Sequence, residues 1–324
     1  MGANCSNKQC CGDGKDDGKT LTEQFPALKA DQPKDGDHSM GMSQAMESYM
    51  PDVSPNYIDH DSSSKVPSYF DREMAELVAL KSKYSESDIG ARPVYRFRSG
   101  ATYEGQWKGH LRHGFGVQKW ADGTTYEGQW HENRAEGMGR FIHSDGDKYA
   151  GEWRGNVAHG KGVYHHKGLT TYEGEWSNDL QEGYGVETWE ENSRYEGEFH
   201  GGQKEGVGVY FWPDGAEYRG TWDGNSINGV GTYIGSDGRS FQGKWHDSVI
   251  HGMGKYIWQD GRAYSGQYMF DKKEGFGIFV WPDGRKYEGF WQKGKQHGIG
   301  NYITGDGVSK SAMWKEGKRC DEDN

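Results

Sequence analysis

The sequence has little of the material from which most globular cores are made. Hydrophobic residues account for 32% of the 324 residues, which argues against a thick core of Leu, Ile and Val. No apolar run reaches the length of a membrane span and no signal peptide precedes the chain, so we expect a cytosolic protein. The net charge of −11 and the lack of a basic stripe argue against nucleic acid as a partner.

Cysteine is scarce and unevenly placed. Three of the four cysteines, Cys5, Cys10 and Cys11, crowd the N-terminus, and Cys320 lies near the other end. A disulfide framework would distribute cysteines through the folded part, so the sequence excludes one. A zinc site at Cys10 and Cys11 is a weak alternative, because a second pair of ligands at suitable spacing is missing.

Catalytic signatures are also missing. The sequence has no Ser-His-Asp or Cys-His arrangement and none of the kinase catalytic motifs, and its Gly-x-Gly pairs are not followed by the helix that a phosphate loop requires. A ladder of His and Glu precedes these pairs, but its members would lie about 10 Å apart, too far to share a metal ion. We therefore expect no enzyme activity, no metal site and no cofactor. The ladder consists of His113, Glu136, His159, Glu182, Glu205, Asn228, His251, Glu274 and His297.

Glycine and aromatic residues are abundant instead, and they recur with a fixed period. Most of the 52 glycines, and most of the aromatic residues that make up 14% of the chain, fall into one unit. It opens with Tyr-x-Gly-x-Trp, continues to Gly-x-Gly and ends with an aromatic residue shortly before Asp-Gly. A fixed period of this size indicates a repeat architecture. At a step of 23 residues, the opening aromatic falls at Tyr103, Tyr126, Tyr149, Tyr172, Tyr195, Tyr218, Phe241, Tyr264 and Tyr287.

Each unit reads as one β-hairpin. Tyr103, Gly105 and Trp107 alternate on one face of a strand, a second strand begins at Gly114, and pairs such as Asp122-Gly123 suit tight turns that need positive φ. Mid-strand glycines such as Gly105 would leave room for an aromatic ring from a neighbouring strand. The sequence thus predicts an all-β fold over residues 94–317, an elongated single-layer antiparallel sheet about 90 Å long, with partial copies at both ends.

At these residues the chain resembles the MORN (membrane occupation and recognition nexus) repeat family. Nine in-register copies of the unit carry the resemblance. It implies twisted sheets of hairpins that act as scaffolds or adaptors, often at membranes or on the cytoskeleton. Some members of the family have been associated with phosphoinositides.

The N-terminus fits a lipid anchor over residues 1–11. Met-Gly-Ala-Asn-Cys-Ser matches the myristoylation pattern at Gly2, and palmitoylation of Cys5, Cys10 or Cys11 would supply the second signal that stable anchoring needs. Chance is the alternative, since short N-terminal patterns are easily matched. Residues 12–67 are polar and acidic, which predicts a disordered tether, and residues 318–324 form an acidic tail.

Residues 68–90 predict an amphipathic helix. Ser68 and Asp71 resemble a capping box, and apolar residues follow at helical spacing over about 69–87. We expect this helix to cover the exposed first edge of the sheet, with a binding helix for another protein as the alternative. The apolar residues are Phe70, Met74, Leu77, Val78 and Tyr84.

The aromatic columns predict a groove for a peptide or a helix, unless the rings only stack on one another to hold the array together. The function expected is a membrane-anchored scaffold on the cytosolic face of the plasma membrane, or of an internal or cortical membrane, that recruits proteins along the array. A phosphoinositide-binding module, a regulatory subunit of a lipid-signalling enzyme, and a homodimer remain open. The candidate lining is Tyr103, Trp107, Tyr126, Trp130, Tyr149, Trp153, Tyr172, Trp176, Tyr218, Trp222, Trp245, Tyr287 and Trp291.

Overall fold

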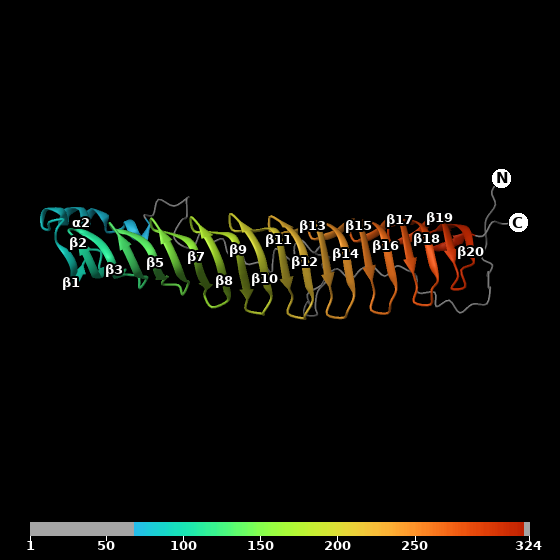
Figure 1. Cartoon of the computed structure of the whole chain (residues 1–324), viewed down its shortest axis with the longest axis horizontal. Helices are drawn as coiled ribbons and strands as arrows, with labels where there is room; N and C mark the ends of the chain where they lie inside the picture. Colours follow the sequence, from blue (N-terminus) through green and yellow to red (C-terminus); the bar gives the residue numbers. More distant parts are fainter. Residues whose placement is uncertain (1–67, 321–324) are drawn as a thin grey trace, which may run out of the picture.

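A computed structural model describes residues 68–320, which form one open sheet of 21 strands preceded by a short helical segment (Figure 1). Each strand pairs antiparallel with the next one in the chain, so the sheet grows hairpin by hairpin into a long array. The predicted all-β, single-layer antiparallel architecture is confirmed. Among the described residues, no helix is long and apolar enough to span a membrane. The strands are β1 (Ile89–Arg96), β2 (Thr102–Lys108), β3 (Leu111–Lys119), β4 (Thr125–His131), β5 (Arg134–Ile142), β6 (Lys148–Arg154), β7 (Val157–His166), β8 (Thr170–Ser177), β9 (Leu180–Trp189), β10 (Arg194–His200), β11 (Gln203–Phe211), β12 (Glu217–Asp223), β13 (Ser226–Ile234), β14 (Ser240–His246), β15 (Val249–Ile257), β16 (Ala263–Met269), β17 (Lys272–Val280), β18 (Lys286–Gln292), β19 (Lys295–Ile303), β20 (Ser309–Lys315) and β21 (Lys318–Cys320).

The two faces of the sheet differ, as the period of two predicts. In β2, Tyr103 and Trp107 are buried while Glu104 and Gln106 are exposed. We call the side of Tyr103 the aromatic face and the opposite side the outer face. The second strand of the first hairpin begins at Leu111, three residues before the predicted start at Gly114.

The array has two kinds of turn. The prediction that the Asp-Gly pairs form the tightest turns is wrong. The Asp122-Gly123 pair lies in a five-residue connection, in which the Trp120 N–H donates to the Thr124 carbonyl (2.9 Å) and the Gly123 N–H to the Trp120 carbonyl (3.1 Å). The two-residue turn lies at the opposite edge, where Glu132 and Asn133 have φ values of 48° and 71°. Primed hairpin turns need this geometry, and the residues that adopt it vary from repeat to repeat.

The two glycines of Gly-x-Gly have different tasks. Gly114 has a φ of 69°, at the bulge where the β2–β3 register shifts. A Cβ on Gly116 would lie 2.5 Å from ring atoms of Tyr103. Tyr103 of the neighbouring strand therefore lies over Gly116, as predicted for a strand glycine. At Gly105, which the sequence names, a Cβ would instead meet the Gly116 backbone and the hydroxyl of Tyr103 in its own strand.

Side chains of the two-residue turns join each repeat to the one before. Asn133 Oδ1 accepts from the Arg112 N–H (2.7 Å), and the Asn133 N–H donates to the Arg112 carbonyl (3.0 Å). Asn156 and Asp179 make the same pair of bonds one and two repeats further on. Backbone groups at this edge are thus satisfied between repeats as well as within them.

The segment before the sheet is shorter and more broken than the predicted helix over 69–87. It consists of η2 (Tyr69–Asp71), α2 (Met74–Ala79) and η3 (Leu80–Ser82). Leu77 is fully buried, but Val78 and Tyr84 are exposed. Its position also corrects the sequence interpretation, because the contacts described below place the segment on the aromatic face of the first repeats rather than along the first edge (Figure 1).

Candidate protein-binding face

The columns predicted to line a groove are core residues. All thirteen predicted side chains are between 0% and 3% exposed, so the prediction that they form an accessible aromatic surface is wrong. Tyr126, for example, packs edge to face on Trp130 (centroids 4.9 Å apart) and on Trp153 of the next repeat (5.2 Å). Trp130 Nε1 also donates to the Gly116 carbonyl (3.2 Å). These rings hold neighbouring repeats together, which is the role that the sequence left as the alternative.

A second tier of tryptophans, near the Asp-Gly turns, includes the more accessible rings. Trp212, Trp258 and Trp281 are partly exposed. Arg262 lies over Trp258 (5.6 Å to the ring centroid) and Arg285 over Trp281 (5.5 Å). The sequence signal for this tier is the aromatic residue shortly before an Asp-Gly pair, but the repeat period does not show that these rings are the accessible ones.

The helical segment covers this face in the first three repeats. The Phe70 ring lies in a cage of five rings, with centroids 5.3 to 5.9 Å away: Trp120, Tyr126, Trp130, Phe141 and Trp153. Trp120, of the second tier, is only 5% exposed here. A segment from outside the array can therefore bury an aromatic anchor among the repeat columns.

Carboxylates of the segment add directional bonds to the same face. Glu73 Oε2 accepts from Trp120 Nε1 (3.1 Å), and Glu73 Oε1 accepts from Ser99 Oγ (3.0 Å). Glu76 accepts from Tyr95 Oη (2.7 Å) and from the Arg98 N–H (3.0 Å). Burial raises the pKa of Glu76, but these two hydrogen bonds outweigh it and leave that pKa below its ordinary value.

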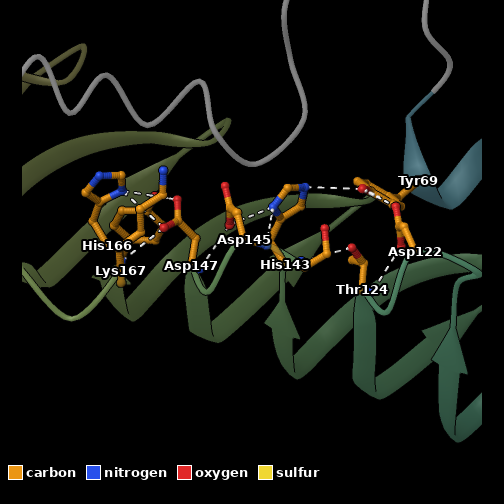
Figure 2. A network of polar contacts seen from close by, with 10 residues as sticks. Tyr69, Asp122, Thr124, His143, Asp145, Asp147, His166 and Lys167 are labelled. Atoms are coloured by element: carbon orange, nitrogen blue, oxygen red, sulfur yellow. Dashed lines mark hydrogen bonds and ion pairs between the residues drawn. The ribbon is translucent and has the colours of Figure 1, made fainter.

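Tyr69 connects the segment to the turns of the next repeats (Figure 2). Its hydroxyl donates to Asp122 Oδ2 (2.6 Å) and lies 3.2 Å from His143 Nε2. His143 Nδ1 in turn lies 2.7 Å from Asp145 Oδ1. Burial and the Asp122 carboxylate raise the pKa of Tyr69, so the phenol keeps its proton and remains a donor.

Arg112, in the first repeat, hydrogen-bonds the backbone of the segment. Its Nη2 donates to the Phe70 carbonyl (3.2 Å) and to the Asn133 carbonyl (3.0 Å), and its Nη1 donates to Gln118 Oε1 (3.2 Å). The side chain is fully buried, which lowers its pKa to about 10. The guanidinium therefore stays charged at neutral pH.

The same ring cage is filled differently further along the array. Ala135 lies at the cage that holds Phe70, and in the cage six repeats later that position is Lys273. Its Nζ lies 4.9 to 5.5 Å from the centroids of Trp258, Tyr264, Phe279 and Trp291. A small residue at this position leaves room for a ring from outside, whereas a lysine fills the cage from within.

The nine repeats also match a family model, that of the MORN repeat. It matches residues 103–125, 126–148, 149–168, 172–194, 195–217, 218–238, 241–261, 264–284 and 287–309. The chain belongs to the MORN repeat family. MORN repeats indicate a repeat-based protein-binding or membrane-associated module.

No curated protein matches the chain. Among solved structures it is similar to the TCP10 domain of Danio rerio CPAP in complex with a STIL peptide, at 12% identity over 68% of this chain and 99% of that chain, with a TM-score of 0.36. The SAS-4 TCP domain of Drosophila melanogaster, in complex with a proline-rich motif of Ana2, matches at 11% identity over 55% and 85%, with a TM-score of 0.28. These values are too low to support an inference about this chain.

The His and Glu ladder of the MORN array consists partly of turn caps. Glu136 accepts from the Gly155 N–H (2.9 Å) and Glu182 from the Gly201 N–H (3.0 Å), each at the first residue of a two-residue turn. Among residues 68–320, no three His, Cys, Asp or Glu side chains come together as a metal site. The predicted lipidation residues Gly2, Cys5, Cys10 and Cys11 lie outside the described residues.

Proposed function

We propose that this MORN protein is a non-catalytic scaffold, anchored to the cytosolic face of a membrane through Gly2 and one or more of Cys5, Cys10 and Cys11. One observation carries the recruiting part of the proposal. The aromatic face of the first three repeats binds a segment with an aromatic anchor and nearby carboxylates, while the second-tier rings Trp212, Trp258 and Trp281 remain partly exposed.

The partner that this surface fits is a segment with the chemistry of residues 69–82. An aromatic side chain would pack on the second tier. Acidic side chains would join Asp260 (2.6 Å) and Asp283 (2.7 Å) on the guanidinium groups of Arg262 and Arg285, which lie over the same rings. Recognition would combine ring burial with charge-assisted hydrogen bonds. It would place the partner along the array, at a distance from the membrane set by residues 12–67.

Two variants of the full chain test the two halves separately. Gly2→Ala should move the protein to the soluble fraction, because one remaining lipid signal does not hold a protein stably.

Trp258→Ala with Trp281→Ala should reduce binding of a synthetic peptide of residues 68–82 at least about tenfold, a loss that truncation of hot-spot aromatic residues commonly exceeds. Phe115→Ala, on the outer face, is the matched control. Unchanged membrane retention, or equal peptide binding by all three proteins, would refute the corresponding half.

Direct binding of phosphoinositides is the second candidate, and the charge distribution is the reason to keep it. Residues 218–320 contain fifteen basic and ten acidic residues, and the side chains of Lys and Arg attract anionic headgroups. Liposomes with and without phosphoinositide, mixed with non-acylated protein, distinguish the candidates. Lipid-dependent co-sedimentation would favour this function over protein recruitment.

A further inference from the structure

The accessible rings of the second tier have the same surroundings as the ring that residues 69–82 cover. Each tryptophan lies two residues before the aspartate of its turn, and its backbone N–H donates to the carbonyl four residues further on (2.9 Å). A side chain that binds at the covered ring therefore also fits the accessible ones. The covered pair is Trp120 and Asp122, and the accessible pairs are Trp212 and Asp214, Trp258 and Asp260, and Trp281 and Asp283.

Tyr69 shows which side chain this is. Its ring packs edge to face on Trp120 (centroids 5.2 Å apart), and its hydroxyl donates to Asp122 Oδ2 (2.6 Å). The ring and the hydroxyl both meet groups near the turn, whereas Phe70 occupies the cage. A tyrosine can therefore bind in this way even where a lysine fills the cage.

The sequence before Ser68 contains the same chemistry twice more. Residues 57–59 read Tyr-Ile-Asp, close to the Tyr-Phe-Asp of residues 69–71, and residues 48–50 read Ser-Tyr-Met, close to the Ser-Tyr-Phe of residues 68–70. The two earlier tripeptides lie outside the described residues. Each offers a tyrosine next to an apolar side chain, as the docked segment does.

Residues 46–61 also complement the later repeats in charge. They contain four acidic residues and no Lys or Arg. After the sixth, seventh and eighth repeats, the residue that follows Asp-Gly is an arginine whose side chain is between 26% and 34% exposed. Each of the three binds the aspartate of its own turn, and a guanidinium has five donors with which it can also meet a carboxylate of the segment. They are Arg239, Arg262 and Arg285.

Followed back from α2, the chain crosses the aromatic face in the direction of these repeats. Glu76 of α2 accepts from Tyr95 Oη of β1 (2.7 Å). The Tyr69 hydroxyl, earlier in the chain, lies 3.2 Å from His143 Nε2, in the second repeat. Ser68 therefore lies on the side of the segment that faces the later repeats.

The lengths agree with two of the accessible rings. Trp212 and Trp258 lie four and six repeats beyond the ring that Tyr69 covers, about 38 and 58 Å at two strands of about 4.8 Å per repeat. Tyr57 and Tyr49 lie 12 and 20 residues before Tyr69, and extended chains of these lengths reach at most about 43 and 72 Å.

We propose that residues 46–61 dock on the aromatic face of their own chain, with Tyr57 at Trp212 and Tyr49 at Trp258. The inference rests on the proposed function, because these are the rings offered to a partner, and it makes residues 46–61 an internal competitor that the partner must displace. A tether holds the segment at an effective concentration in the millimolar range, so a site with a dissociation constant of about 0.1 mM is about nine-tenths occupied.

Hydrogen exchange of the non-acylated full chain tests the docking. Tyr49→Ala with Tyr57→Ala should make the turn amides of Gly215 and Gly261 exchange about tenfold faster, the change expected when a segment docked about nine-tenths of the time is released. The triple variant Ser62→Ala, Ser63→Ala and Ser64→Ala lies in the same part of the chain and should exchange as the wild type does. Equal exchange in the wild type and the tyrosine variant would overturn the proposal.

Deletion of residues 62–64 tests whether the segment comes from the same chain. Nine residues then separate Tyr57 from Tyr69 and reach at most about 32 Å, short of the roughly 38 Å to Trp212. Exchange at Gly215 should therefore rise to that of the tyrosine variant, whereas the triple serine variant, which keeps the length, stays protected. Protection that survives the deletion would assign the docked segment to a second copy and would overturn the proposal.

Titration with the synthetic peptide of residues 68–82 separates this inference from the proposed function. The tyrosine variant should bind the peptide about tenfold more tightly than the wild type, because its own segment no longer occupies the rings. Equal affinity with no change in exchange would overturn the inference and leave the partner site standing. Exchange that responds to the tyrosines, with no peptide binding by either protein, would support the inference and refute the partner site.

Discussion

The aromatic face has the same ring columns in residues 103–171 and in residues 195–309, but the two regions differ in what lies on them. In the first, residues 69–82 bury Phe70 among five rings, and Trp120 is only 5% exposed. In the second, Trp212, Trp258 and Trp281 are partly exposed. A repeat that is built to bind its neighbour can thus also bind a segment from outside the array.

One position in each repeat distinguishes the regions. Ala135 leaves the cage open to Phe70, whereas Lys204 and Lys273 place their own ammonium groups among the equivalent rings. Lys204 is also held by Glu187 (2.7 Å), and both side chains of that pair are buried. The difference shows that burial of an aromatic side chain inside a cage requires a small residue such as Ala135, whereas second-tier rings such as Trp258 are partly exposed even where a lysine fills the cage.

The largest effect is expected from removing the anchor. Phe70→Ala in the full chain should destabilise the first three repeats by about 3 to 5 kcal/mol, the usual cost of truncating a buried Phe. Faster hydrogen exchange in β3 to β6 would show the loss, because array segments can open locally. Phe115→Ala, half exposed on the outer face of the same repeat, is the control. Equal exchange in both variants would contradict the assigned role of Phe70.

Converting the Glu187–Lys204 pair, which joins the fourth repeat to the fifth, to its counterpart one repeat later should have the next largest effect. Lys204→Ile alone should cost about 3 kcal/mol, because it leaves the Glu187 carboxylate buried without its partner. Glu187→Tyr in addition reproduces the Tyr210 and Ile227 pair found one repeat later, and a well-packed apolar pair commonly replaces a buried ion pair without loss. Urea denaturation of both variants measures the difference. A double variant as unstable as the single one would show that the cost does not come from the unpaired carboxylate.

Most of the fold could be predicted from the period of 23 residues. It predicted the hairpins, the two faces and the single sheet, because Tyr103, Gly116 and their equivalents satisfy the same local geometry in every copy. The binding surface was harder to predict. A period of two places Tyr103 and Trp107 on one face, but it does not show that rings from successive repeats cover one another completely. The docking of Phe70 brings a non-periodic segment onto rings such as Tyr126 and Trp153, contacts between distant parts of the chain that no spacing encodes.

The smallest effect is a loss of protection of residues 69–82 from hydrogen exchange, which we expect at acid pH. Burial raises the pKa of Glu76, but hydrogen bonds from Tyr95 and the Arg98 N–H leave it lower than the ordinary 4.5. Burial likewise raises the pKa of Asp122, and hydrogen bonds from Tyr69 and Thr124 leave it lower than the ordinary 3.8. A lowered carboxyl pKa stabilises the bound segment at all pH values above the ordinary pKa, and that contribution is lost as the pH falls through the lowered one. Exchange in residues 69–82 should therefore be constant from pH 7 to 5, after correction for the intrinsic rate, and increase below about pH 4.

Glu76 and Asp122 make their contacts at one end of the array, so the expected change in exchange is confined to residues 69–82 and the strands that they contact. Glu76→Gln should weaken the binding of the segment at neutral pH and reduce its dependence on pH, since a neutral amide keeps its shape but cannot lose a charge. A loss of protection between pH 7 and 6 would contradict the carboxylate explanation.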